Sequence, residues 1–243
     1  MNSKITFIAI FLIFCFSQQG ISQIWLDIAA RGGYGFSGFY NKNVWDDTEH
    51  NNGFNTGYSF GGKLGINIGE HNGIMLETNI MNGVQEFTYK ANNAKTPNLT
   101  EWQTLDLNAL YRFNNTGSYL ELGPSMSLVR SVKQSFAGLP LDNSNLYTER
   151  YFSAMAGFGG FITGNEFFTL IMGLRLGYCL TDLLGPDTKN LTNPPPAHYQ
   201  TYDSYSPIQP FFAQFTVEIS FGIGAVARAN CGRRTYLFGS RYR

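Results

Sequence analysis

The feature that most constrains this chain is an alternation of apolar and polar residues that recurs along its whole length. In the stretch 215–221, F-T-V-E-I-S-F, every second residue is apolar. Successive side chains of a β-strand point to opposite faces, so this pattern predicts a strand with one apolar and one polar face. Similar alternation predicts eight strands, at residues 24–40, 54–68, 73–90, 101–114, 118–137, 148–164, 167–184 and 208–226.

The connections between these strands also alternate. Three are short and rich in turn-forming residues, at 69–73, 114–117 and 163–166. Four are longer and polar, at 41–53, 91–100, 138–147 and 185–207. Antiparallel strands joined in this order place all short turns at one end and all long loops at the other. The pattern predicts an all-β fold, an eight-stranded antiparallel transmembrane β-barrel with three short periplasmic turns and four longer extracellular loops. A soluble sandwich has no reason to sort its loops in this way.

The composition agrees with a surface that faces lipid. Charged residues make up 14% of the chain, against about 25% in soluble domains. Aromatic residues make up 16% and fall near the predicted strand ends, as they do in interfacial girdles. Trp102 is among those expected to face outward at the outer rim. A soluble β core would explain the number of aromatic residues but not their clustering.

The N-terminus has the pattern of a secretory signal peptide. Lys4 is followed by a mostly apolar run over 5–16 and by a small-x-small cleavage site over 20–22. We therefore divide the chain into a signal peptide at 1–22, a barrel at 23–226 and a basic periplasmic tail at 227–243. A lipid anchor at Cys15 is disfavoured by the bulky Phe14 before it. Beyond the signal no run of 18 apolar residues occurs, which excludes a membrane helix.

The polar faces of the predicted strands carry charges that would point into the lumen. The set contains four bases and five acids, namely Asp27, Arg31, Lys63, Glu77, Asp106, Arg112, Glu121, Arg175 and Glu218. An eight-stranded barrel is only wide enough for side chains to fill. Unpaired buried charges are costly, so we expect these groups to pair and to close the lumen.

Catalytic and metal-binding patterns are weak. His50 with Asp46 or Asp47 and a loop serine would resemble the surface triads of barrel lipases and acyltransferases, and His198 lies on another outer loop, but such spacing is unspecific. Metal-ligand spacing and phosphate-binding loops are absent from the sequence. We therefore expect no enzyme activity, no cofactor and no metal. Cys179 and Cys231 are predicted at opposite ends of the barrel, too far apart for a disulfide.

Two segments are candidates for contact with a partner. The loop 185–207 has three consecutive prolines and the tyrosines Tyr199, Tyr202 and Tyr205, which supply rigid contact area or pack over the barrel mouth. The tail has arginines without acids, and its candidate contacts are Arg233, Arg234, Tyr236 and Phe238. It would bind anionic headgroups or an acidic protein face, unless it is a solvated end.

The segment F-G-I-G-A-V-A-R-A-N-C-G-R-R at 221–234, with the eight-strand layout, resembles the small outer-membrane β-barrel proteins common in Bacteroidota, of the OmpA-transmembrane-like or PorT-like type. The resemblance implies insertion by the barrel-assembly machinery. It also implies that a last strand closing on an aromatic residue is the assembly signal, here Phe215, Val217, Ile219 and Phe221. It carries over no catalytic residue.

We therefore expect a non-enzymatic outer-membrane protein with a closed polar lumen and periplasmic termini, acting as a structural anchor or as a subunit of an outer-membrane complex. Its expected partners are outer-membrane lipids, the barrel-assembly machinery, and other envelope proteins at the outer loops or the tail. The balance of 17 basic and 17 acidic residues gives no reason to expect nucleic acid. The alternative is a transporter or porin for a small or apolar solute. A surface lipid hydrolase or acyltransferase is the third hypothesis.

Overall fold

The computed structural model describes residues 24–53, 55–69, 71–91, 94–141, 144–164, 168–190 and 201–223. The predicted signal peptide and basic tail lie outside these ranges. The strands are β1 (Ile24–Tyr40), β2 (His50–Gly53), β3 (Asn55–Ile68), β4 (Asn72–Ala91), β5 (Ala94–Asn115), β6 (Ser118–Phe136), β7 (Leu139–Leu141), β8 (Arg150–Gly164), β9 (Phe168–Cys179) and β10 (Gln209–Ile223). The helices are α2 (Lys42–Asp46), η1 (Ser144–Leu146) and η2 (Pro186–Asn190).

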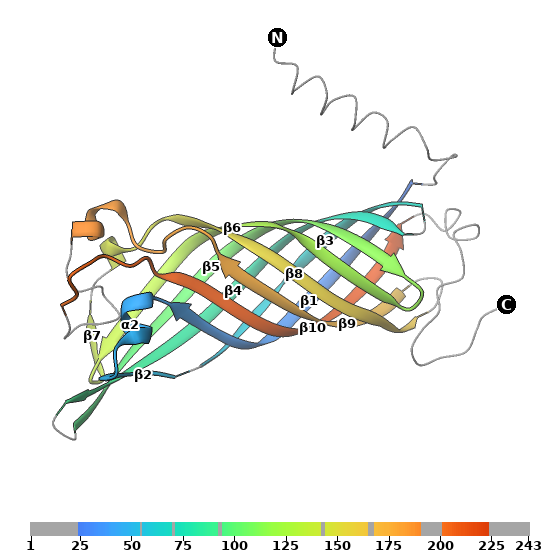
Figure 1. Cartoon of the computed structure of the whole chain (residues 1–243). Helices are drawn as coiled ribbons and strands as arrows, with labels where there is room; N and C mark the ends of the chain where they lie inside the picture. Colours follow the sequence, from blue (N-terminus) through green and yellow to red (C-terminus); the bar gives the residue numbers. More distant parts are fainter. Residues whose placement is uncertain are drawn as a thin grey trace, which may run out of the picture.

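Eight of the strands form a closed antiparallel ring. Their order is β4-β3-β1-β10-β9-β8-β6-β5, and β5 pairs back with β4. The first and last strands of the ring meet in a continuous ladder from Leu26 opposite Ile223 to Tyr40 opposite Gln209. Figure 1 shows the resulting barrel, with β2 and β7 as short additions on β4 and β6. The predicted eight-stranded antiparallel fold is confirmed.

The two ends of the barrel differ as the loop lengths predict. At one end, here called the short-turn end, β3 joins β4 and β5 joins β6 through tight turns. Gly69 and Gly117 adopt φ values of 66° and 77° in these turns, a left-handed conformation that glycine adopts without steric cost. The opposite, long-loop end carries α2, η1 and η2 (Figure 1).

The two faces of each strand separate by polarity. On β6, the Glu121 residue is 1% exposed and its neighbour Leu122 is 51% exposed. The same alternation runs along β9, where Arg175 is buried between the exposed Leu174 and Leu176. Along these strands the outer wall of the barrel is therefore apolar and the middle of the lumen polar, the reverse of a soluble protein.

One predicted loop is mostly strand. The segment 91–100 was expected as an outer loop, but β5 begins at Ala94 and pairs with β4 up to Ala91 opposite Ala94. The β4–β5 hairpin thus projects beyond the rest of the long-loop end (Figure 1). Its tip lacks the apolar alternation that predicts strands, because a hairpin that leaves the barrel wall has no lipid to face.

The seventh predicted strand is shorter than expected. It was predicted to end at 184, but β9 ends at Cys179. The chain turns at Asp182, whose carboxylate accepts hydrogen bonds from the backbone N–H groups of Leu184 (3.1 Å) and Ile208 (2.9 Å). Leu183 and Leu184 are apolar because they are buried at the mouth. Among the described residues, no helix has the length and apolar character needed to cross a membrane.

Candidate functional site

The lumen contains a connected group of ionised side chains near the middle of the barrel. Eight of the nine predicted lumen charges take part, and we call them the central charge cluster: Asp27, Arg31, Lys63, Glu77, Arg112, Glu121, Arg175 and Glu218. They come from β1, β3, β4, β5, β6, β9 and β10. Their side chains are at most 6% exposed.

Arg31 of β1 joins three strands at once. Its Nη1 donates to Glu77 Oε1 at 3.0 Å and to Glu121 Oε1 at 3.1 Å, and its Nη2 donates to Glu218 Oε2 at 2.6 Å. A planar guanidinium with several donors suits such multiple contacts better than a lysine ammonium. Arg31 therefore crosslinks the lumen in several directions.

The other three bases of the cluster, Lys63, Arg112 and Arg175, each contact two carboxylates. Arg112 Nη2 lies 2.9 Å from Glu121 Oε2 and 2.9 Å from Glu218 Oε2, while Lys63 contacts Glu218 and lies 3.4 Å from Asp27. Arg175 lies 2.6 Å from Glu77 Oε2 and 2.5 Å from Glu121 Oε1. The guanidinium of Arg112 also stacks over the Tyr119 ring, 4.4 Å from its centroid.

The central charge cluster is electrically balanced, with four bases and four acids. Ions removed from water are tolerated when their partners satisfy both their charge and their hydrogen bonds. Every base in the cluster contacts at least two carboxylates. The arrangement can therefore tie the strands together and fill the lumen. Across the described ranges, no group of three or more His, Cys, Asp or Glu residues could hold a metal ion.

Asp106 is the ninth predicted lumen charge, and it stands apart from the cluster. It is 5% exposed, and one of its carboxylate oxygens accepts a hydrogen bond from Thr104 Oγ1 at 2.7 Å. Ser127 and Tyr151 also lie beside it. Among the described residues, no lysine or arginine forms an ion pair with it. One acid of the lumen is thus surrounded by hydroxyl groups instead of a base.

An apolar layer lies in the lumen toward the long-loop end. We call it the mouth core, and its buried members are Phe39, Val44, Phe87, Trp102, Tyr147, Tyr151, Cys179, Leu183, Leu184 and Ile208. Trp102 was expected to face outward at the rim, but it is 1% exposed and packs against Phe39 in a tilted arrangement, with 4.2 Å between the ring centroids. The sequence did not predict this layer, because inward aromatic residues fall at the same strand ends as an interfacial girdle.

The loop tyrosines pack within the chain. The hydroxyl of Tyr202 donates to Asp47 Oδ2 at 3.0 Å, and that of Tyr205 donates to Asp182. Both rings pack against the mouth core. The hydroxyls of Tyr202 and Tyr205 are therefore occupied by internal partners. Tyr199 lies outside the described residues.

The other predicted site residues lie on the last strand, on β2 or outside the described residues. Phe215, Val217, Ile219 and Phe221 all lie on the outward face of β10, opposite in parity to the buried Glu218. His50 begins β2. Arg233, Arg234, Tyr236 and Phe238 of the tail, and His198, lie outside the described residues.

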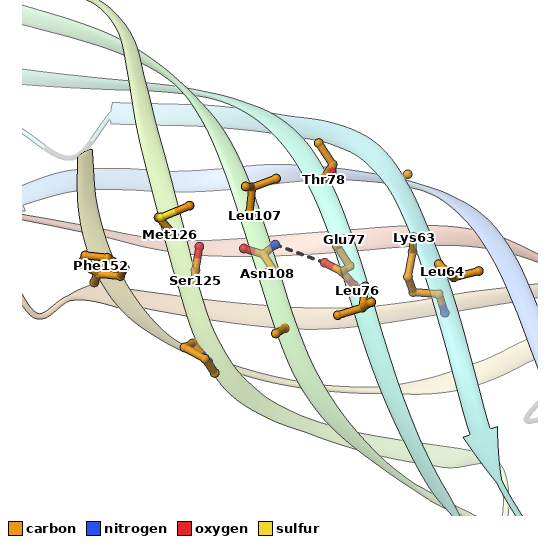
Figure 2. Close-up of a pocket in the computed structure, with 13 residues that line it drawn as sticks. Lys63, Leu64, Leu76, Glu77, Thr78, Leu107, Asn108, Ser125, Met126 and Phe152 are labelled. Carbon is orange, nitrogen blue, oxygen red and sulfur yellow. Dashed lines mark hydrogen bonds between the residues drawn. The ribbon is translucent and has the colours of Figure 1, made fainter. Parts of the chain in front are cut away.

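A groove of about 730 Å³ lies on the outer wall and spans β3 to β8. Its outward lining residues are Gly62, Leu64, Leu76, Thr78, Leu107, Ala109, Pro124, Met126 and Phe152. Figure 2 shows them with the hydrogen bond from Asn108 to Glu77, which marks the lumen side of the same wall. Pairing between β5 and β6 lapses within the groove, at Ala109–Leu110 opposite Gly123–Pro124. Proline has no N–H, so a ladder hydrogen bond cannot form there.

Comparisons with known proteins give one family match and several similar solved structures. Residues 7–193 match the family described as "Outer membrane protein beta-barrel domain". The outer membrane protein OprG from Pseudomonas aeruginosa is 10% identical, with a TM-score of 0.44 over 82% of this chain and 95% of that chain. Neisserial surface protein A is 11% identical, with a TM-score of 0.41 over 81% and 96% of the two chains. No curated protein gives a match.

Proposed function

Because the chain belongs to the family of outer membrane protein beta-barrel domains, we propose that it is a non-enzymatic barrel with a closed polar lumen, serving as a structural anchor or as a subunit of an outer-membrane complex. Family membership gives the location in the outer membrane. The role within that membrane is the proposal.

The central charge cluster is the observation that carries this function. Its ion pairs join side chains from across the ring, and Arg31 alone contacts three carboxylates. A solute would have to separate several buried ion pairs to pass, and buried charges without partners are costly. The mouth core adds an apolar layer above them. Both features favour a role as an anchor or subunit, which uses the barrel wall and its loops, over a role as a channel, which uses the lumen.

Two experiments test the proposal. The purified barrel reconstituted in planar bilayers is expected to show no stepwise conductance at moderate voltage. Steady single-channel currents would contradict a closed lumen. Affinity purification from gently solubilised membranes is expected to recover a defined protein partner, and a monomer recovered repeatedly would rule out the subunit role.

The proposed orientation places both chain ends and the short-turn end in the periplasm, with the long-loop end outside. The neighbouring positions of Ile24 and Ile223 at the short-turn end support the part of this proposal that puts both ends on one side, because an even number of ring strands returns the chain to the side where it began. Cysteines introduced at Gly117 and Leu139 would report this directly. A membrane-impermeant thiol reagent added to intact cells should label the second position and not the first.

The basic tail, including Arg233, Arg234, Tyr236 and Phe238, is the segment we propose for contact with anionic headgroups or with an acidic periplasmic protein. Its excess of arginine over acids supports this assignment. Deletion of residues 232–243 should leave barrel assembly intact and release a co-purifying partner. Unchanged partners would defeat the docking role. That the chain is related in particular to the small outer-membrane barrels common in Bacteroidota is also part of the proposal.

A second candidate function, transport of a small apolar solute through the wall, is favoured by one observation. The β5–β6 ladder lapses at Pro124, which has no N–H to donate across the seam. A disulfide between cysteines at Ala109 and Pro124 would lock this seam. Uptake of an apolar dye that falls in the locked form would support transport, and uptake equal to that of the reduced form would exclude it.

A further inference from the structure

The groove on the outer wall leads to two unpaired arginines at the long-loop end. Arg150 of β8 lies opposite Leu128 of β6, two residues beyond the groove residues Phe152 and Met126. Arg130 follows two residues further along β6, and both arginines are exposed. Among the described residues, neither guanidinium forms an ion pair. We propose that this surface binds a lipid with an anionic phosphate headgroup, the phosphate at Arg130 and Arg150 and an acyl chain in the groove.

The groove has the length of one acyl chain. Directly facing residues follow it across five strands, from Phe152 through Met126, Leu107 and Thr78 to Gly62. Four steps between neighbouring strands, at about 4.8 Å each, give a length of about 19 Å. One leaflet of the hydrocarbon core is about 15 Å deep. An acyl chain that lies along this row of residues, across the strands and oblique to the membrane normal, therefore fits.

The backbone around Gly62 does not require a glycine at this position. A Cβ atom at this position would meet no atom closer than the Ala29 carbonyl oxygen, at 3.9 Å. At Gly123, by contrast, a Cβ would collide with the Ala109 carbonyl. A larger side chain could therefore occupy position 62, and its absence leaves the space that an acyl chain would take.

The chemistry of the surface favours a lipid over a protein segment. Lys63 and Glu77 lie in the groove wall, but their side chains turn into the lumen and are 1% exposed. The outward surface then offers carbon atoms and the Thr78 hydroxyl, with positive charge at one end only. An amphiphile with one anionic end matches this layout. The groove is also continuous with the lipid-facing wall, where acyl chains are the surrounding medium.

The test uses the full-length barrel in detergent, titrated with phosphatidylglycerol or with phosphatidylcholine of the same acyl chains, while thermal unfolding and native mass spectra are recorded. Phosphatidylglycerol is expected to bind more tightly and to raise the unfolding temperature more. Replacing Arg130 or Arg150 with alanine should weaken its binding about fivefold for each arginine. The double variant should bind the two lipids alike.

The acyl-chain part is tested by filling the groove. Gly62→Leu should weaken binding of both lipids, while Gly32→Leu serves as the matched control. Gly32 also faces outward, and its Cβ would likewise meet nothing closer than 3.9 Å, but it does not line the groove. Equal binding by Gly62→Leu and the unmodified barrel would overturn the assignment, as would equal weakening by Gly32→Leu. Should Gly62→Leu fail to fold, unchanged lipid preference in the surface variant Arg130→Ala/Arg150→Ala would overturn it as well.

Discussion

Arg31 and Glu218 lie directly opposite each other across the β1–β10 seam, and Arg31 Nη2 donates to Glu218 Oε2 at 2.6 Å. This is the seam at which the ring closes. Glu218 also accepts hydrogen bonds from Arg112 and from Lys63, so three bases depend on one carboxylate. The contact between Arg31 and Glu218 therefore joins the first and last strands of the ring and also pairs opposite charges in the middle of the lumen.

Replacing Glu218 with glutamine should destabilise the barrel strongly. Three buried cations would lose their common anion, and breaking a buried ion pair typically costs about 3–5 kcal/mol. Urea unfolding in detergent micelles, followed by tryptophan fluorescence, measures the free energy of unfolding. Ser220→Ala, two residues away on the same inward face, is the control and should cost about 1 kcal/mol or less. Equal stability of the two variants would contradict the importance of the cluster.

Asp106→Asn should leave the barrel at least as stable as before. The amide keeps an oxygen that can accept from Thr104, and the change removes a buried charge that has no basic partner among the described residues. Glu121→Gln provides the contrast, because Glu121 contacts Arg31, Arg112 and Arg175. Parallel urea titrations should give opposite signs for the two changes. A loss at Asp106 as large as that at Glu121 would show that Asp106 has an essential charged partner.

Trp102→Ala should cost about 3–5 kcal/mol, the usual range for a buried tryptophan or phenylalanine. Trp102 fills the mouth core and packs against Phe39, so its removal leaves a cavity under the loops. Limited proteolysis of the long-loop end should become faster in this variant. Leu139→Ala, at a side chain that is 69% exposed, should change stability by no more than about 0.5 kcal/mol.

The loop contacts should weaken at high pH. Burial, together with the hydrogen bond to Asp47, raises the pKa of Tyr202 above its ordinary value. The pKa of Tyr205 is raised by burial and by its hydrogen bond to Asp182. A folded-state pKa above the unfolded value means that the stabilising contribution is complete below about pH 10 and is lost as the pH rises further.

Tyrosine ionisation followed by ultraviolet absorbance, alongside proteolysis of the loops, measures this effect. Tyr202→Phe/Tyr205→Phe should remove the alkaline transition in loop protection, because phenylalanine does not titrate. A transition of the same size in that variant would assign the effect to other groups.

The sequence predicts the fold well because one physical rule, alternation, acts on every strand of a ring between lipid and a polar lumen. Leu122 and Glu121 fall on opposite faces from parity alone, and the structure has them so. Parity does not say which strands face each other across the lumen. That Arg31 meets Glu77 and Glu121 as well as its neighbour Glu218 depends on the stagger of all eight strands.

Residues beyond the lipid-facing part of the barrel are harder to predict. Apolar residues there pack under the loops, or are absent, so their pattern does not report which face of a strand meets lipid. Trp102 is aromatic because it packs under the loops, and Leu183 is apolar because it closes the mouth. The projecting part of β5 has strand geometry without an apolar face. The groove was also missed, because a hollow such as that at Gly62 depends on the neighbours that surround a small residue and not on the residue itself.

The position of Glu218 on the last strand has a consequence for how the chain matures. Until β10 is in place, the lumen holds four bases of the central cluster against the three acids Asp27, Glu77 and Glu121, and the sheet has two open edges. Adding β10 supplies the missing negative charge and the missing hydrogen-bonding partner for both edges. Completion of the wall and neutrality of the central charge cluster are thus a single event, so a chain that lacks β10 has both open sheet edges and an unbalanced cluster.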